Sequence, residues 1–122
     1  MDAMDAFELL EYAAKVDKSV RYAAVRSRGE VWMWSRPDLA NASDSESDRY
    51  EELLVNPTLL LLVKQRGQID CGGMDYVIIR YGNFFQVVKE IDPETHISLA
   101  VGIDGDLIRV ANRMSEVLAT RT

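Results

Sequence analysis

The sequence has few of the residues that metal, redox and disulfide chemistry require. It contains one cysteine and one histidine among 122 residues. One cysteine forms no internal disulfide, and a single imidazole with scattered carboxylates supplies too few ligands for a metal centre. The thiol and the imidazole, Cys71 and His96, fall in separate predicted elements, so nothing in the sequence brings them together for nucleophilic catalysis. The sequence therefore predicts no metal, no cofactor, no catalytic residue and no enzymatic activity.

Long apolar runs and basic segments are also lacking. The longest strictly apolar run covers residues 59–63, whereas a membrane span needs roughly 20 residues. Acidic residues outnumber basic ones by 20 to 14, and the resulting net charge of −6 disfavours binding to nucleic acid or anionic membranes. Residues 1–5 are acidic where a secretory signal is basic. We expect a cytoplasmic protein with neither a nucleic-acid nor a membrane partner.

What is present is typical of one globular domain. Apolar residues make up 48% of the chain and charged residues 28%. A folded chain of this length buries about two-thirds of its surface, which is enough for one core and too little for two. The polar stretch at residues 41–48 is too short to link two domains and is predicted to be a loop that leads into a helix. We expect residues 1–122 to form a single domain.

The chain is predicted to begin with a helix and a hairpin. Asp2 can cap a helix whose apolar residues recur at helical spacing as far as Val16. Two β-prone runs, Val20–Ser27 and residues 31–35, meet around Arg28-Gly29, which is a hairpin signal.

A second helical region is predicted over residues 47–66. It contains Asn56-Pro57, and because Asn is a good helix cap and Pro a good first helical residue, both two helices and one kinked helix are compatible with it. Gly67 is expected to cap its C-terminal end.

Three strands and a helix complete the pattern. Residues 74–81 and 84–91 are β-prone, and Gly82-Asn83 between them places glycine first in the turn, which predicts a type II′ hairpin. Residues 96–103 form a further strand, and residues 107–118 carry the apolar stripe of a last helix. The predicted order is helix, two strands, helix, three strands, helix.

The predicted strands are nearly continuous apolar runs, such as YVII, FFQVV and ISLAVGI. Strands of this kind need both faces covered. Three helical regions suffice if they divide between the two sides of a five-stranded antiparallel sheet. The sequence therefore predicts a three-layer α/β/α sandwich.

The first hairpin and the later part of the chain carry a family resemblance. Residues 22–32 read YAAVRSRGEVW, with small apolar residues, a polar turn with Gly29 and a return strand. Residues 76–118 contain a hairpin, a further strand and a closing helix entered at Gly105. In these features and in its element order, the chain resembles the roadblock family of dynein light chains and GTPase-associated proteins over nearly its whole length. Pro57, the pair of tryptophans on the second strand and the tight Gly82-Asn83 turn depart from the family pattern.

The resemblance implies a non-enzymatic module. Roadblock domains usually form homodimers or heterodimers by joining their edge strands, and they act as scaffolds or regulators, often for small Ras-like GTPases. The implied sheet order, 2-1-5-4-3, makes the third strand an edge, and an apolar edge needs a partner to cover it. We therefore expect a homodimer whose interface contains Leu59, Leu60, Leu62, Val63, Tyr76, Val77, Ile78, Ile79 and Arg80.

Two further hypotheses concern other partners. Residues 19–37 carry a net charge of +3 and residues 38–56 a net charge of −5, so Arg26 and Arg28 at the first hairpin turn are expected to steer an acidic partner towards this end. A ligand-sensing domain, with a pocket between the sheet and a helix, is the alternative function.

Overall fold

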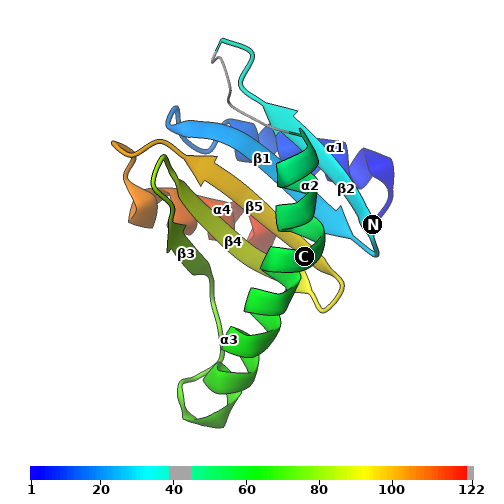
Figure 1. The fold of residues 1–122 in the computed structure, drawn as a ribbon, viewed down its shortest axis with the longest axis vertical. Helices are drawn as coiled ribbons and strands as arrows, with labels where there is room; N and C mark the ends of the chain where they lie inside the picture. Colours follow the sequence, from blue (N-terminus) through cyan, green and yellow to red (C-terminus); the bar gives the residue numbers. More distant parts are fainter. Residues whose placement is uncertain (39–44, 121–122) are drawn as a thin grey trace.

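A five-stranded antiparallel sheet forms the middle layer of the computed structural model, which describes residues 1–38 and 45–120 (Figure 1). The strands lie in the order β2-β1-β5-β4-β3, which confirms the expected sheet order and makes β2 and β3 its edges. Every neighbouring pair is antiparallel. The strands are β1 Val20–Ser27, β2 Glu30–Ser35, β3 Val77–Arg80, β4 Phe85–Asp92 and β5 Thr95–Val101.

Helices cover both faces of this sheet. α1 (Ala3–Ala14) and α4 (Leu107–Thr120) lie behind it in Figure 1, and the helical stretch of α2 (Ser45–Tyr50), η1 (Glu51–Val55) and α3 (Asn56–Asp70) crosses its front. The central strand β5 is buried along its whole length because it is covered on both sides. The predicted α/β/α sandwich is therefore confirmed.

The main core lies between the sheet and the helices α1 and α4. Asp2 caps the start of α1, and its carboxylate accepts the backbone N–H of Asp5 at 2.9 Å in a capping box. The apolar stripe of each helix then packs on the sheet, and the buried side chains there include Leu9, Val25, Ile97, Leu99 and Met114. The opposite face of the sheet is left for the middle helix.

The middle helix is one continuous stretch from α2 through η1 to α3, so it is one helix and not two separate ones. Glu51–Val55 is π-helical, and the N–H of Asn56 bonds the carbonyl of Glu51, five residues earlier. Pro57 follows at once, has no N–H to donate and would crowd an ordinary preceding turn. The widened π turn, a feature frequent at functional sites, gives the proline room and turns Glu52 to the sheet.

The helix ends later than expected, and the assignment of Gly67 as its cap is wrong. α3 continues to Asp70, and the chain turns back through Gly72 and Gly73, which have φ values of 79° and 96°. A Cβ atom on Gly67 would lie 2.7 Å from the carbonyl oxygen of Gly73. Gly67 is therefore needed for the close approach of the returning chain, not for a left-handed cap.

Both predicted hairpins form, but their turns differ from each other. Arg28 and Gly29 have φ values of 51° and 83°, as a type I′ turn requires at its two central positions. In the second hairpin the N–H of Tyr81 bonds the carbonyl of Phe84 at 2.9 Å, yet Gly82 does not adopt a positive φ, so the type II′ prediction is wrong.

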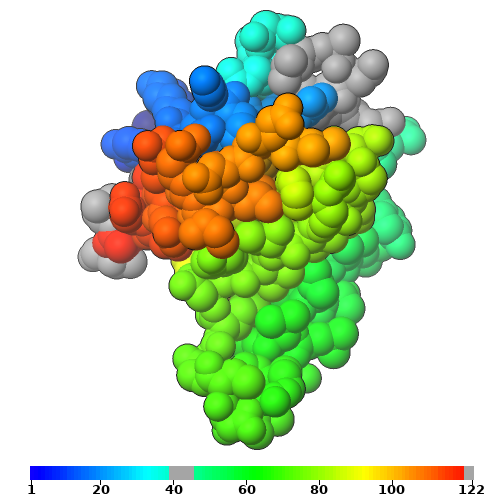
Figure 2. All heavy atoms as spheres, turned by 90° about the vertical axis from the view of Figure 1, so that its left-hand side faces the viewer, coloured from blue at the N-terminus to red at the C-terminus, as the bar shows by residue number. Residues whose placement is uncertain are grey.

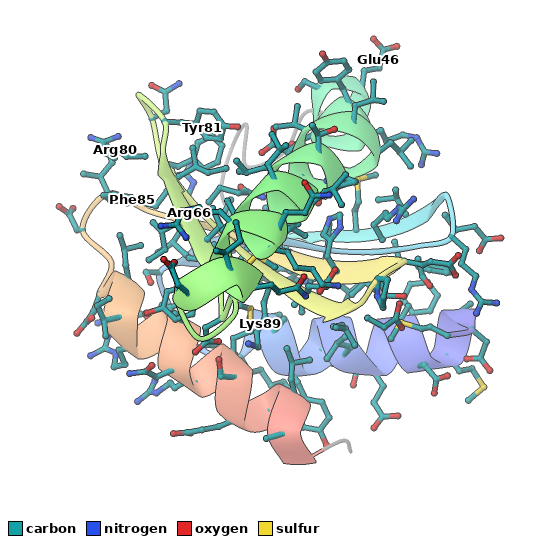
Figure 3. The ribbon with its side chains drawn as sticks, turned by 90° about the horizontal axis from the view of Figure 1, so that it is seen from below. Glu46, Arg66, Arg80, Tyr81, Phe85 and Lys89 are labelled. Atoms are coloured by element: carbon teal, nitrogen blue, oxygen red, sulfur yellow. The ribbon has the colours of Figure 1, made fainter. Side chains whose placement is uncertain are left out.

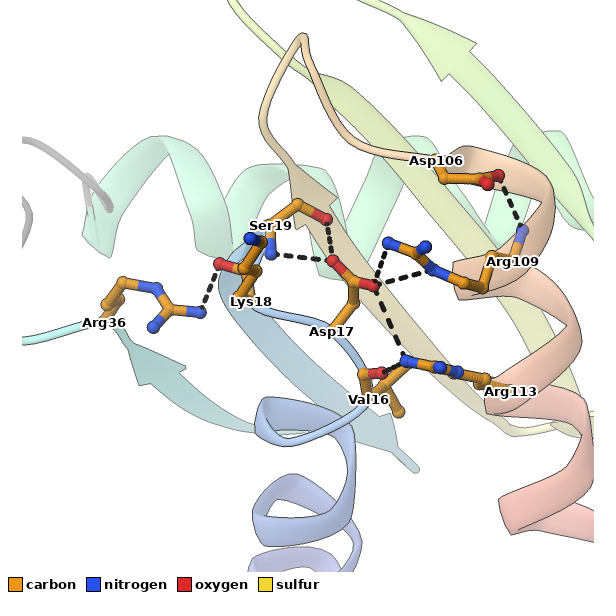
Figure 4. Close-up of polar contacts among 8 residues, drawn as sticks. All are labelled: Val16, Asp17, Lys18, Ser19, Arg36, Asp106, Arg109 and Arg113. Atoms are coloured by element: carbon orange, nitrogen blue, oxygen red, sulfur yellow. Dashed lines mark hydrogen bonds and ion pairs between the residues drawn. The ribbon is translucent and has the colours of Figure 1, made fainter.

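The two ends of the sandwich differ in the contacts between their elements. At one end, the buried carboxylate of Asp17 accepts hydrogen bonds from the N–H and hydroxyl of Ser19 and from Arg109 (Figure 4). This network joins the end of α1 to α4. At the other end, the C-terminal half of α3 and the segment that returns to β3 project beyond the sheet (Figure 2). The projection exposes Leu61, Leu62 and Ile69 by 54–76% of their surface.

Candidate interaction surface beside strand β3

Strand β3 has a hydrogen-bonding edge that pairs with nothing in the described chain. Its partner is β4, with Val77 opposite Val88 and Arg80 opposite Phe85. The N–H of Tyr81 bonds Phe84 in the same register, and N–H groups alternate in direction along a strand. The N–H groups of Val77 and Ile79 therefore face β4, whereas those of Ile78 and Arg80 face the free edge.

An open apolar groove of about 700 Å³ runs between this edge and the middle helix. Tyr50, Leu54 and Leu62 are each about 60% exposed, which is unusual for side chains of this size. The whole lining consists of Tyr50, Leu54, Val55, Thr58, Leu59, Leu62, Ile79 and Tyr81. The free strand edge and the exposed apolar groove form one continuous surface, which we call the β3 surface.

The structure places the residues expected in a dimer interface in several positions. Leu59, Leu62 and Ile79 line the groove, and Val63 is exposed beside Leu62. Tyr76 and Ile78 pack on the opposite face, against the α1 and α4 core, and the exposed Arg80 lies over Phe85, which packs against the same core. Val77 is half-buried and lies opposite Val88 of β4. Leu60 is only 4% exposed, so it belongs to the interior and presents almost no surface to a partner.

Polar contacts hold the rim of the groove in shape. The hydroxyl of Tyr81 donates to the carboxylate of Glu51 at 2.9 Å, which joins the β3–β4 hairpin to η1. Burial raises the pKa of Glu51 and, with the nearby Glu51 charge, raises the pKa of Tyr81 to about 12. On the other face of this hairpin, away from the groove, Arg80 lies over the ring of Phe85, 4.9 Å from its centre (Figure 3).

Beneath η1 lies a buried polar cluster that the sequence reasoning did not find. Glu52 is fully buried, and its carboxylate accepts hydrogen bonds from four side chains. They are Tyr22 at 3.2 Å, Asn56 at 2.9 Å, His96 at 2.8 Å and Ser98 at 2.7 Å. Burial raises the pKa of Tyr22, so its hydroxyl stays protonated and donates. No signal in the sequence marked Glu52, because three of its donors are 30 to 46 residues away along the chain.

The cluster has no arrangement for nucleophilic catalysis. Ser98 donates to Glu52 and not to His96, so the hydroxyl is not paired with the imidazole as a base would require. Cys71 is exposed at the end of α3, beside Arg66 and Asp70. Within residues 1–38 and 45–120, no group of three His, Cys, Asp or Glu side chains could hold a metal ion, and no helix is long and apolar enough to cross a membrane.

The two hairpin arginines both contact the turn that contains Glu94. Arg28 forms an ion pair with the Glu94 carboxylate at 2.8 Å, and its side chain is 76% exposed. Arg26 is half-buried and donates to the backbone carbonyl of Glu94 at 2.9 Å. Of the two, Arg28 is the one presented to solvent.

Together these features define a class of protein: an α/β/α sandwich with one apolar sheet edge left open beside a helix. By sequence, the chain matches no protein-family model and no curated protein. Its structure is similar to a Roadblock/LC7 domain from Streptomyces avermitilis, with a TM-score of 0.67 and 15% identity over 94% of this chain and 89% of that one. The chain therefore has the fold of a Roadblock/LC7 domain, which confirms at the level of the fold the resemblance drawn from its sequence.

Two further structures support this assignment of the fold. The gliding protein MglB from Thermus thermophilus has a TM-score of 0.69 and 15% identity, over 98% of this chain and 92% of that one. A structure described as MglB with a tetrameric arrangement has a TM-score of 0.70 and 15% identity, over 98% and 91%. Each comparison covers nearly the whole length of both chains.

Proposed function

We propose that this chain is a non-enzymatic regulatory scaffold that forms a homodimer through the β3 surface and acts on a small Ras-like GTPase. The observation that carries the proposal is the free edge of β3 lying directly beside exposed Tyr50, Leu54 and Leu62. An edge of this kind is a template for pairing, and a large exposed apolar patch marks an interaction site. A roadblock-like fold gives the GTPase part of the proposal, because such domains often regulate these proteins.

A second copy of the chain fits the β3 surface in both of its parts. Two β3 strands related by a twofold axis would pair antiparallel, and the N–H groups of Ile78 and Arg80 would gain carbonyl partners. The groove beside each strand would be covered by the helix of the other copy. The tetrameric arrangement described for an MglB structure supports self-association of this fold.

Light scattering tests the self-association. We expect the wild-type chain to be a dimer at micromolar concentration and Leu62→Glu to be a monomer, because the substitution places a charge in the groove. Ile108→Glu is the matched control, since Ile108 is exposed to a similar extent on α4, on the opposite side of the sheet. A monomeric wild-type chain, or equal behaviour of the two variants, would contradict the proposed dimer.

Affinity purification tests the regulatory role. The chain would be used as bait in cell extract with excess GDP or with a GTP analogue, and bound proteins would be identified by mass spectrometry. We expect a protein with a phosphate-binding P-loop whose recovery depends on the nucleotide, and lower recovery with Arg28→Glu, because Arg28 steers an acidic partner. Recovery of no GTPase under either condition would contradict this role and leave the dimer unaffected.

A further inference from the structure

Strand β2 is the other open edge of the sheet. It pairs with β1 on one side, and no strand of the described chain pairs with its other side. The N–H of Arg36, just after β2, bonds the carbonyl of Arg21 in β1 at 2.9 Å, and N–H groups alternate in direction along a strand. The N–H and C=O groups of Val31, Met33 and Ser35 therefore face the free edge, where they can pair with another strand.

One flank of α1 adds apolar side chains to this edge. α1 lies behind β1 and β2 in Figure 1, and its neighbour in that layer is α4. Asp5 lines a pocket with Ser115 of α4, so the flank of α1 that carries Asp5 faces α4. Phe7 is two positions further on, about 200° round the helix, and therefore lies on the flank towards β2. Phe7 is 55% exposed, and Met4, about one turn before it, is 81% exposed.

The side chains of β2 are complementary to those of a second, antiparallel copy of the strand. Residues 28–38 read RGEVWMWSRPD, with Met33 in the middle. A twofold axis at Met33 places Glu30 opposite Arg36 of the second copy and the two tryptophans opposite those of the second copy. Opposite charges and aromatic pairs on facing strands both stabilise a sheet.

The neighbouring registers bring like charges together. Moving the axis one residue towards the N-terminus places Arg28 opposite Arg36 of the second copy. Moving it one residue towards the C-terminus places Glu30 opposite Asp38. Like charges on facing strands destabilise the pairing. In the register centred on Met33, Arg28 is instead at the level of Asp38, so this register alone of the three has opposite charges at both ends.

The charges at the two ends of β2 have no ion-pair partners of their own in the described chain. Glu30 is exposed, and Arg36 is half-buried over the Trp34 ring, 5.9 Å from its centre. Arg36 donates to the backbone carbonyls of Val20 and, as Figure 4 shows, of Lys18. Among the described residues, neither Arg36 nor Glu30 forms an ion pair. Both charges are therefore available to a second copy.

The other basic residues of this hairpin are neutralised or lie behind the edge. Arg28 forms its ion pair with Glu94, and Arg21 and Arg26 belong to β1, one strand away from the edge. Their repulsion on a second copy is therefore weaker than the attraction between the facing charges at the ends of β2.

We propose that β2 pairs antiparallel with β2 of a second copy about a twofold axis at Met33. Met33 exchanges two hydrogen bonds with its twin, and Val31 exchanges two with Ser35 of the other copy. The exposed flank of α1, with Phe7 and Met4, then lies beside the same flank of the second α1. This edge pairing satisfies the free N–H and C=O groups of β2, which would otherwise be an open template.

This contact goes beyond the proposed dimer and does not rest on it, because β2 and β3 are opposite edges of the sheet. A chain with a twofold contact at each edge would join dimers into longer assemblies with one continuous sheet. The tryptophans of β2 are already half-buried, so pairing here covers less apolar surface than at the β3 surface and should need a higher protein concentration.

Cysteine cross-linking tests the register. The background is the full-length chain with Cys71→Ser, which removes the native thiol, and Leu62→Glu, which removes pairing at the β3 surface. On mild oxidation, Met33→Cys should form a disulfide-linked dimer, because the Cα atoms of a hydrogen-bonded pair are about 5.5 Å apart, within the range of a disulfide. Ser35→Cys is the matched control, since it is more exposed on the same edge but lies opposite Val31, and it should cross-link to itself at least about tenfold more slowly. Val31→Cys mixed with Ser35→Cys should cross-link one variant to the other.

Sedimentation equilibrium tests the charges in the same Leu62→Glu background. Glu30→Lys should weaken association at least about tenfold, because it turns two attractive pairs into repulsive ones. Glu116→Lys, at an exposed position on α4, makes the same change in net charge and should leave association unchanged. No association, equal effects of the two charge reversals, or cross-linking of Ser35→Cys as fast as Met33→Cys would overturn the proposal. Each of these results would leave the β3 dimer unaffected, since that dimer is tested by comparing Leu62→Glu with the wild-type chain.

Discussion

Glu52 shows how one residue can hold a helix on a sheet. An isolated carboxylate without exposure would be strongly unfavourable, but this one accepts four hydrogen bonds, from β1, α3 and β5. Both oxygens of this carboxylate are bonded, so any shift of η1 would leave a buried charge with fewer donors. Glu52 therefore fixes the position of η1 over the sheet and, through the adjacent Glu51 and Tyr81, the rim of the groove.

Glu52→Gln should lower the free energy of unfolding by about 2–4 kcal/mol. The glutamine amide has one acceptor oxygen in place of two, and its NH₂ group would face donors. Glu51→Gln is the matched control, because the neighbouring Glu51 is half-buried and has one described side-chain partner, Tyr81. Urea denaturation of both variants measures the difference. Equal losses would contradict the special role of Glu52.

Asp17 should make stability depend on acid. Hydrogen bonds from the N–H and hydroxyl of Ser19, with the charge of Arg109, lower the pKa of Asp17 from 3.8 to about 2. Because the folded-state pKa is depressed, the stabilisation is fully present above about pH 4 and is lost as pH falls towards 2. It amounts to no more than about 2 kcal/mol.

The measurement compares Asp17→Asn with the wild-type chain by urea denaturation at about pH 5 and about pH 2.5. The difference in free energy of unfolding between the two proteins should shrink at the lower pH. The reason is that the Asp17 carboxylate of the wild-type chain becomes partly protonated there and loses the stabilisation of its charged form. A difference that does not change with pH would contradict the lowered pKa of Asp17.

At the scale of elements, the hydrophobic pattern predicted the helices and strands. The structure departs from the predicted elements where residues that are distant in the sequence contact each other. The apolar stripes of α1 and α4 and the runs in β1, β4 and β5 depend on neighbours along the chain, which the sequence displays. The role of Gly67 depends on Gly73 returning against it. The π turn depends on Pro57 and on the hydrogen bonds that join Glu52 to the sheet. Contacts of this kind have no period, so the sequence did not reveal them.

Gly67→Ala tests this interpretation of the helix end. Alanine would ordinarily stabilise a helix interior by about 1 kcal/mol relative to glycine. Here the new Cβ would lie 2.7 Å from the Gly73 oxygen, so we expect a net loss of about 1–3 kcal/mol. Gly82→Ala is the control, since its Cβ would meet nothing within 4 Å and its φ is not positive. A melt in which Gly67→Ala is as stable as wild type would contradict the close approach.

For the whole molecule, the sequence was most informative about layers and least informative about surfaces. Continuous apolar strands required helices on both faces, and this alone led to the sandwich. The tertiary structure decides which apolar residues remain exposed. Leu60 and Leu62 are two positions apart on one helix, yet the first is 4% exposed and the second 60%. Only the path of the helix over the sheet distinguishes a core leucine from one available to a partner.

Because N–H groups alternate in direction along β3, proline substitutions in this strand can test folding and self-association separately. Val77→Pro removes an N–H that faces β4, so it should lower the melting temperature. Arg80→Pro removes an N–H that faces the free edge, so it should leave the inner ladder intact and weaken the dimer. Arg80→Ala is its control, because both variants lose the contact with the Phe85 ring, but only the proline loses the N–H. Light scattering and a thermal melt on each variant give the two readouts. A dimer of wild-type affinity in Arg80→Pro would show that the two copies meet by some other surface, since an edge that pairs with its twin needs that donor.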